Sequence, residues 1–178
     1  YDVTVEVNDP NVGSGPDDSE SFSLSINDVN DPPTVATTGS STDEGTNDTI
    51  TQGELAATDA EEGPAGLTYT IDTDVSEGQL YNLFTSTQLD NADTFTQEDL
   101  NDGLIEYRHD GTEPASESFG FTVRDGAGGS ASGTFTITID PVNDAPTVAT
   151  NQTLSVNEGA SADLSQGLLE ATDPDDAA

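Results

Sequence analysis

An internal repeat is the feature that most constrains how this chain can fold. The segment NDPPTVAT begins at Asn30 and returns as NDAPTVAT at Asn143. A second pair, QGELAATDAEE from Gln52 and QGLLEATDPDD from Gln166, recurs at nearly the same spacing. The period of about 113 residues is long enough for one domain with its own core. The predicted units are the end of one repeat, a complete repeat and the start of a third, at residues 1–31, 32–143 and 144–178.

Short segments within the repeats alternate apolar and polar residues with a period of two, which is typical of strands with one buried face. In the complete repeat the apolar stripes run over residues 67–71, 119–123 and 135–139. Two further stripes, at residues 1–7 and 22–26, belong to the preceding repeat. Gly, Asn and Asp separate the stripes. The pattern predicts an all-β fold of tandem Greek-key β-sandwiches, whose inward faces lie about 10 Å apart.

Two segments between these stripes have other signatures. Thr96 is a suitable N-cap, acidic residues follow in the first turn, and Gly103 comes after, so one helical turn is expected over residues 96–101. The glycine-rich run at residues 126–129 is predicted to be a hairpin loop. It is not expected to bind phosphate, because no helix follows it.

The charge of the chain excludes several classes of partner. It has 36 acidic residues, only two basic ones, Arg108 and Arg124, and a formal net charge of -34. Nucleic acids and anionic membrane surfaces are bound through Lys and Arg, so neither is an expected partner. No apolar segment approaches the roughly 20 residues that a membrane-spanning helix needs, so no membrane insertion is expected. The same composition is compatible with disorder, which the strand pattern disfavours.

Acidic residues gather at the predicted junctions between repeats. One cluster is DVNDPP at residues 28–33, a second is TDAEEG at residues 58–63, and Asp125 follows the stripe that ends at Val123. A solvated loop is the commoner role of such a cluster. These acidic clusters, however, recur with the repeat, and their negative charges gather at each junction, where they would repel one another. Both facts favour a bound counter-ion. With no Cys in the chain, a hard cation such as calcium, held by six to eight oxygens, is the expected cross-link.

These motifs resemble the cadherin superfamily, in its bacterial cadherin-like form and in the related chondroitin-sulfate-proteoglycan type of repeat. DVNDPP is similar to the cadherin inter-domain linker, and ATDAEEGPAGLTYTI (57–71) is similar to a segment of the cadherin domain. TDEG and VNEG, with Glu44 and Glu158, resemble the cadherin first strand. YRHDGTE and FGFTVRDGAGG are closer to the proteoglycan type. The resemblance implies immunoglobulin-like β-sandwiches joined by calcium ions.

The resemblance also implies which residues bind calcium at the first junction. The matching ligands are four side chains and two backbone carbonyls, from Asn30, Asp59, Glu61, Asp125, Pro32 and Ala65. Asp28 and Asp31 match ligands of further linker ions whose partners would lie before Tyr1. The first junction is therefore expected to hold one complete site, with the other sites weak or empty.

At the second junction the implied ligands come from the complete repeat, the linker and the following repeat. The residues that match cadherin calcium ligands, or that lie next to a matching position, are Glu44, Asp140, Asn143, Asp144, Asp173 and Asp175. Pro141 stands where the first junction has Asp28, so Asp140 is the nearest substitute. The cadherin DRE motif is absent, and Asp110 and Glu113 are the candidates to replace it.

The expected function is that of a calcium-rigidified extender repeat in a large extracellular protein. The layout resembles that of giant repeats-in-toxin adhesins on bacterial cells, where neighbouring repeats of the same polypeptide are the main partners. A polysaccharide-binding module, using Tyr81 and Phe84, and self-association of like repeats into fibres remain alternatives. An enzyme is not expected, because His109 and Asp110 are neighbours that a strand directs to opposite faces, and the chain has no Cys and no second His.

Overall fold

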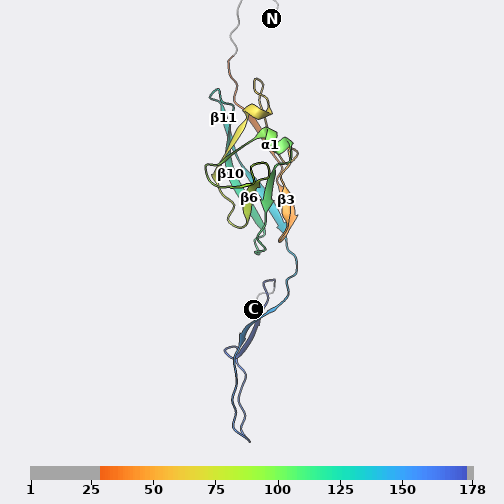
Figure 1. Ribbon diagram of the computed structural model, residues 1–178, viewed down its shortest axis with the longest axis vertical. Coiled ribbons are helices and arrows are strands. Elements are labelled where there is room, and N and C mark those ends of the chain that lie inside the picture. Colours follow the sequence, from red (N-terminus) through yellow and green to blue (C-terminus); the bar gives the residue numbers. More distant parts are fainter. Residues whose placement is uncertain (1–28, 176–178) are drawn as a thin grey trace, which may run out of the picture.

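The computed structural model describes residues 29–175, and its main body is a β-sandwich with a linker leaving each end (Figure 1). The strands of the sandwich are β1 (Thr34–Thr37), β2 (Ser40–Asp43), β3 (Asn47–Thr49), β4 (Leu55–Thr58), β5 (Thr68–Thr73), β6 (Gln79–Asn82), β7 (Thr87–Leu89), β8 (Thr94–Thr96), β9 (Ile105–Arg108), β10 (Ser116–Arg124) and β11 (Ser130–Asp140). The all-β prediction is confirmed.

Two sheets form the sandwich. One has the strand order β2-β11-β10-β5-β8, and the other has the order β3-β9-β6-β7. Strands β1 and β4 form a separate antiparallel pair. Within the two sheets, all strand pairs but one are antiparallel as well. The exception is β2, which runs parallel to β11. The chain therefore enters at one end of the sandwich along β1 and leaves at the other end along β11 (Figure 1).

The core contains the residues that the alternation predicted, together with apolar residues from the other strands and from α1. The apolar members of the stripes at 67–71, 119–123 and 135–139 are all buried. Aromatic rings from both the stripes and β8 pack together, and Tyr69 stacks on Phe95 with their ring centroids 4.8 Å apart. Burial of aromatic and β-branched side chains between the sheets stabilises the fold without disulfides.

The two predicted local features are also confirmed. Helix α1 (Gln97–Asn101) begins after Thr96, whose side chain accepts from the Asp99 backbone N–H, while the Asp99 carboxylate accepts from the Thr96 backbone N–H at 2.7 Å. This reciprocal pair is a capping box. Residues 126–129 join β10 to β11, whose register pairs Arg124 with Ser130. A short 3₁₀ helix, Pro64–Gly66, was not expected.

Beyond the sandwich, the described chain continues as an antiparallel pair, β12 (Thr147–Asn151) and β13 (Leu169–Thr172). Val148 and Leu169 are exposed there, since no opposing sheet covers them among the described residues. The apolar stripes predicted at residues 1–7 and 22–26 lie outside the described residues, and the division into three repeats stays a prediction. No helix within residues 29–175 is long and apolar enough to span a membrane.

Candidate cation sites at the two junctions

Strand pairing explains why distant acidic segments meet at each junction. Thr34 opens β1 and pairs with Thr58, the last residue of β4, so the linker before β1 lies beside Asp59. The same arrangement recurs further along the chain, where Thr147 pairs with Thr172 and the preceding linker lies beside Asp173. The threonine hydroxyls are 2.9 Å apart in the first pair and 3.2 Å apart in the second.

The first junction brings Asn30 against Asp125, in the loop between β10 and β11. Asn30 Nδ2 donates to Asp125 Oδ2 at 2.8 Å. Asp125 Oδ1 accepts from the backbone N–H groups of residues 127, 128 and 129, each at 2.9 Å. The side chain is only 1% exposed. The hydrogen bond from Asn30, together with those from the loop, holds the pKa of the Asp125 carboxyl below its ordinary value.

Close packing at this junction depends on Gly129. A Cβ atom there would overlap Asp125 Oδ2 and would lie 2.8 Å from the Cα of Pro32. Only glycine lets the hairpin loop approach the linker so closely. Pro32, whose carbonyl is a predicted ligand, is thereby placed beside Asp125.

Asp59 and Glu61 complete the acidic part of the first junction. Asp59 Oδ1 accepts from the backbone N–H of Glu61 at 2.9 Å and from that of Glu62 at 3.1 Å. Asp59 Oδ2 is buried and has no hydrogen-bond partner. Glu61 Oε2 accepts from the Asp31 backbone N–H at 3.4 Å. Desolvation, and then the carboxylates of Asp59 and Asp31, raise the pKa of the Glu61 carboxyl.

At the second junction, Glu44 lies in the turn after β2 and is buried. Its backbone N–H donates to the Asp140 carbonyl at 2.9 Å. Its Oε2 atom accepts from the Val142 backbone N–H at 3.2 Å. Glu44 is therefore fixed to both the end of β11 and the linker that follows.

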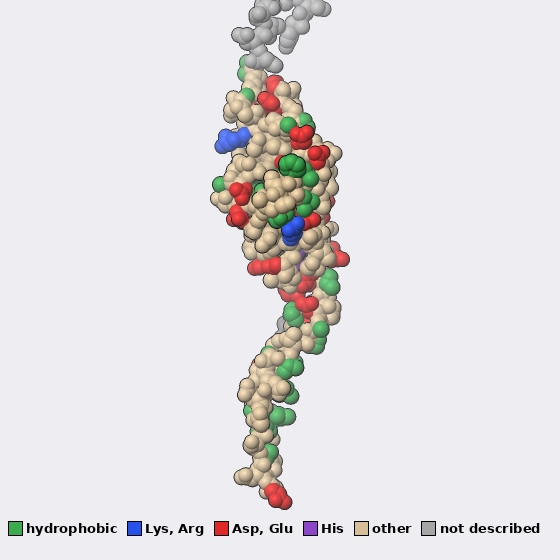
Figure 2. All heavy atoms as spheres, viewed as in Figure 1, with side chains coloured by type: hydrophobic (Ala, Val, Ile, Leu, Met, Phe, Trp, Pro, Cys, Tyr) green, Lys and Arg blue, Asp and Glu red, His purple; other side chains and the backbone are tan. Residues whose placement is uncertain are grey.

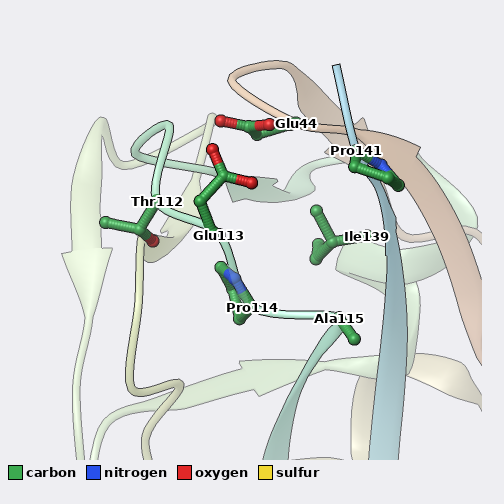
Figure 3. Close-up of a pocket in the computed structure, with 7 residues that line it drawn as sticks. All are labelled: Glu44, Thr112, Glu113, Pro114, Ala115, Ile139 and Pro141. Atoms are coloured by element: carbon green, nitrogen blue, oxygen red, sulfur yellow. The ribbon is translucent and has the colours of Figure 1, made fainter. Parts of the chain in front are cut away.

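Three carboxylates converge at this second junction. Glu44, Glu113 and Asp175 each offer an oxygen, and these oxygens all lie within 4.8 Å of one another. Figure 3 shows the Glu113 carboxylate directed toward Glu44 at the mouth of a pocket of about 180 Å³. Desolvation, and then the charges of Glu44 and Asp175, raise the pKa of the Glu113 carboxyl. No Lys or Arg pairs with these three groups in the described part of the chain.

Three other predicted residues surround this cluster. The Asp144 backbone N–H donates to Asp175 Oδ2 at 2.5 Å, and the Asp175 backbone N–H donates to Asp173 Oδ1 at 3.1 Å. Asn143 Nδ2 donates to the Asp144 carbonyl at 2.6 Å. The linker and the loop after β13 thus form one hydrogen-bonded unit around Asp175.

Some predicted residues are placed differently. The Asp110 carboxylate accepts from the backbone N–H and the hydroxyl of Thr112, which lowers its pKa, and it is not part of the three-carboxylate group. Asp140 is exposed and contributes its backbone carbonyl to Glu44. Ala65 is exposed within the 3₁₀ helix. Asp28 lies outside the described residues. Within residues 29–175, a group of three carboxylates this close together occurs only at the second junction.

The donor set at both junctions consists of oxygen atoms. Carboxylate and carbonyl oxygens suit hard cations such as calcium, while the absence of Cys leaves no soft ligand. Asp59 Oδ2, buried without a hydrogen-bond partner, is an atom that a cation would satisfy. Figure 2 shows acidic side chains at both ends of the sandwich and few basic ones on the visible face. The residues present therefore fit calcium.

The aromatic residues of the carbohydrate alternative lie outside both junctions. Phe84 is 79% exposed, as the sequence suggested, in the turn between β6 and β7. Tyr81 is half-buried, and the Arg108 guanidinium carbon lies 3.6 Å from the centre of its ring. Arg108 also pairs with Glu106 at 2.6 Å. One face of the Tyr81 ring is thus already covered by a cation.

Sequence reasoning gave no structural role to His109, which the structure places between the two loops that carry Glu44 and Glu113. Its Nδ1 atom accepts from the Gly45 backbone N–H at 2.9 Å and from the Gly111 backbone N–H at 3.1 Å. A partial signal lies in the order of the chain, because His109 stands four residues before Glu113.

Comparison with known proteins identifies the family. Residues 32–139 match the family described as cadherin-like. The chain belongs to this cadherin-like family. It is 34% identical over 158 residues to the human extracellular matrix organizing protein FRAS1. The aligned region covers 88% of the chain and 4% of FRAS1. It is 41% identical over 106 residues to human FRAS1-related extracellular matrix protein 2, covering 59% of the chain and 3% of the relative. Extracellular matrix protein 3 of Lytechinus variegatus is 37% identical over 106 residues, with the same coverage.

These relatives confirm the extracellular location expected from the sequence. All three are extracellular matrix proteins by name, and none of their names describes an enzyme. They are animal proteins, whereas the sequence motifs resemble those of bacterial adhesins. The chain spans only a few per cent of the length of these relatives, so it is similar to a small part of each.

Proposed function

We propose that this chain is a calcium-stabilised extender segment that holds successive cadherin-like repeats in line within a long extracellular protein. The observation that carries the proposal is the convergence of Glu44 and Glu113, from the sandwich, with Asp175, from the segment after β13. A cation held by these three groups would tie two consecutive repeats together. Without a cation, the same three carboxylates repel one another.

Calcium suits these sites better than other cations. The flexible oxygen-rich coordination that it accepts can combine carboxylates from separate loops with backbone carbonyls, whereas magnesium demands near-octahedral geometry and keeps its waters. At the second junction the residues that would hold calcium are Glu44, Glu113, Asp144 and Asp175. Asn143 and Asp173 support their positions through hydrogen bonds.

The first junction supports the same function. Asn30, Asp59, Glu61 and Asp125 come from the linker and from two loops of the sandwich, and hydrogen bonds already join linker to loops. The unpaired oxygen of Asp59 is the atom that most favours a cation there. The carbonyls of Pro32 and Ala65, and the carboxylate of Asp31, are further proposed ligands.

The parent protein that best fits the sequence motifs is a giant surface adhesin of the repeats-in-toxin kind. In such a protein, or in a matrix protein, the repeat has the same mechanical role, because a chain of rigid sandwiches keeps a terminal domain at a distance. Its partners are calcium ions and the neighbouring repeats of the same polypeptide.

Calcium titration of the 178-residue chain tests the proposal. Small-angle scattering should show a longer particle in about 2 mM calcium than in chelator, and the melting temperature should rise as calcium binds the folded state. A variant with Glu44→Gln and Asp59→Asn removes one proposed ligand from each junction and should respond little. Identical scattering curves and melting temperatures for the natural chain with calcium and with chelator would overturn the proposal.

A further inference from the structure

His109 lies at the end of the sandwich where the second junction forms, and it is almost completely buried. It is 7% exposed and follows directly after β9. Its ring packs edge-on against Tyr107, with the ring centroids 6.1 Å apart. Its backbone N–H donates to the Thr46 carbonyl at 3.3 Å. Backbone and ring together fix the orientation of this side chain.

Both hydrogen bonds of the ring go to a single atom. Nδ1 accepts from the backbone N–H groups of Gly45 and Gly111, which belong to different loops. Because both partners are donors, Nδ1 carries a lone pair and the ring proton is on Nε2. Nε2 is buried and has no partner, so the contacts of the ring with polar groups are all made through Nδ1.

The two donors are neighbours of proposed calcium ligands. Gly45 directly follows Glu44, and Gly111 lies two residues before Glu113. Both glycines have positive φ, 67° and 83°, a conformation that turns each loop sharply and is rare for other residues. Nδ1 therefore fastens the two turns to one point and sets the distance between the segments that carry Glu44 and Glu113.

We infer that His109 is a positioning residue for the second cation site, where it holds the Glu44 and Glu113 loops at the spacing that lets one ion bind both carboxylates. It does not touch the ion, and it acts through the backbone of Gly45 and Gly111. This inference rests on the proposed function. Outer residues that orient metal ligands typically change affinity about 10- to 100-fold when replaced.

The substitutions that test the inference differ in where they place an acceptor. His109→Phe keeps a ring of similar size but has no acceptor, and the unpaired Nε2 means that no other hydrogen bond is lost. His109→Asn places its Oδ1 atom where Nδ1 stands, so it should restore the two bonds. His109→Gln, with its acceptor farther out, serves as a second loss variant if the Phe variant does not fold.

The first readout needs no metal. Amide hydrogen exchange of the calcium-free chain reports directly on the hydrogen bonds of Gly45 and Gly111. Exchange at both amides should quicken at least about tenfold in His109→Phe and stay near the natural rate in His109→Asn. Unchanged exchange in His109→Phe would show that the ring does not hold the loops.

The second readout compares the two junctions within one molecule by calcium titration followed by nuclear magnetic resonance. The Val142 amide, which donates to Glu44, reports the second site, and the Gly129 amide, which donates to Asp125, reports the first. His109→Phe should weaken binding at the second site at least about tenfold and leave the first within about twofold, while His109→Asn restores the second. Equal loss at both sites, no loss, or no rescue by Asn would overturn the inference. If the natural chain itself binds no calcium, the proposed function fails instead.

Discussion

Glu44 and Asp175 bring their carboxylate oxygens within 4.8 Å of each other although 130 residues separate them in the chain. Glu44 is anchored by the Val142 backbone N–H, and Asp175 is anchored by that of Asp144. Both anchors belong to the linker, so the linker holds one carboxylate on each side. Any change in the direction of the linker would separate the two groups, so the proposed binding of one cation by both carboxylates depends on the angle between the sandwich and the segment that follows.

Removing one side of this pair should loosen the second junction alone. Asp175→Asn replaces a carboxylate with a neutral amide, so calcium affinity there should fall roughly tenfold or more, because binding affinity depends on the number of charged ligands. Isothermal calorimetry measures this change. Asp163→Asn removes the same charge from an exposed residue in the same segment and is the matched control. An equal effect of both substitutions would mean that only overall charge matters.

Asp59→Ala should affect the opposite junction. It removes the carboxylate whose Oδ2 is buried and unpaired, together with the hydrogen bonds that order Glu61 and Glu62. Calcium binding at the first junction should weaken strongly, and binding at the second should hardly change, because Asp59 makes no contact there. Resonance shifts of the Gly129 and Val142 amides distinguish the two sites. Parallel loss at both would show that the assignment of Asp59 is wrong.

Gly129→Ala should destabilise the chain even in chelator. The new Cβ would overlap Asp125 Oδ2 and crowd Pro32, so the hairpin loop must move away from the linker. Overpacking of this kind costs about 1–3 kcal/mol in the free energy of unfolding, measured by urea denaturation. Gly63→Ala is the control, since a Cβ meets nothing within 4 Å there and its φ of -81° suits alanine. A Gly129→Ala variant as stable as Gly63→Ala would contradict the close packing.

The substitution Glu113→Gln should change the melting temperature in opposite directions with and without calcium. In chelator, the raised pKa of Glu113 means that the folded state holds the proton more tightly than the unfolded state. That contribution to stability is present below the ordinary value of 4.5 and is lost as pH rises through the folded-state pKa. Glu113→Gln should therefore raise the melting temperature near neutral pH in chelator.

With calcium present, the same variant should lower the melting temperature, because a proposed ligand is gone. Thermal melts of the natural chain and Glu113→Gln, between about pH 3 and pH 7, check both signs. The advantage of the variant in chelator should vanish at the acidic end, where Glu113 is protonated in both states. A variant that is less stable than the natural chain at every pH in chelator would contradict the repulsion among the three carboxylates.

Calcium should do what monovalent salt cannot. Sodium chloride screens exposed charges over about 8–10 Å, but it does not join carboxylates of different loops in one coordination sphere. About 2 mM calcium should lengthen the particle in small-angle scattering, while sodium chloride at tenfold or higher concentration should stabilise the sandwich only partly. Magnesium should be the poorer substitute. Restoration of both melting temperature and length by sodium chloride would favour general screening instead.

The fold could be predicted from the sequence where local patterns decide it. Alternation identified the buried apolar residues of β5, β10 and β11, and Thr96 with its acidic neighbours identified α1, because side-chain period and capping are local properties. The convergence of Glu44 with Asp175 was also accessible, through the repeat and the resemblance to cadherins. The repeat supplied a spacing, and the resemblance supplied the partners.

Other features depend on contacts that no local pattern contains. The role of His109 requires that the turn after β2 and the turn after β9 lie side by side, which follows from the pairing of β3 with β9. Asp110 was only a candidate to replace an absent cadherin motif, and the hydroxyl and backbone of Thr112 bind its carboxylate locally. The sequence alone offered no means to decide between a local turn and a distant ion.

The parallel pairing of β2 with β11 has a mechanical consequence. These strands are hydrogen-bonded from Ser40 to Asp43 on one side and from Ile137 to Asp140 on the other. The chain enters along β1, which directly precedes β2, and leaves from the end of β11, so opposite pulls on the two linkers that reach β2 and β11 act on them in opposite directions along their length. The bonds between them then resist together in shear and do not open one after another like a zipper, which equips the sandwich to bear load along its long axis.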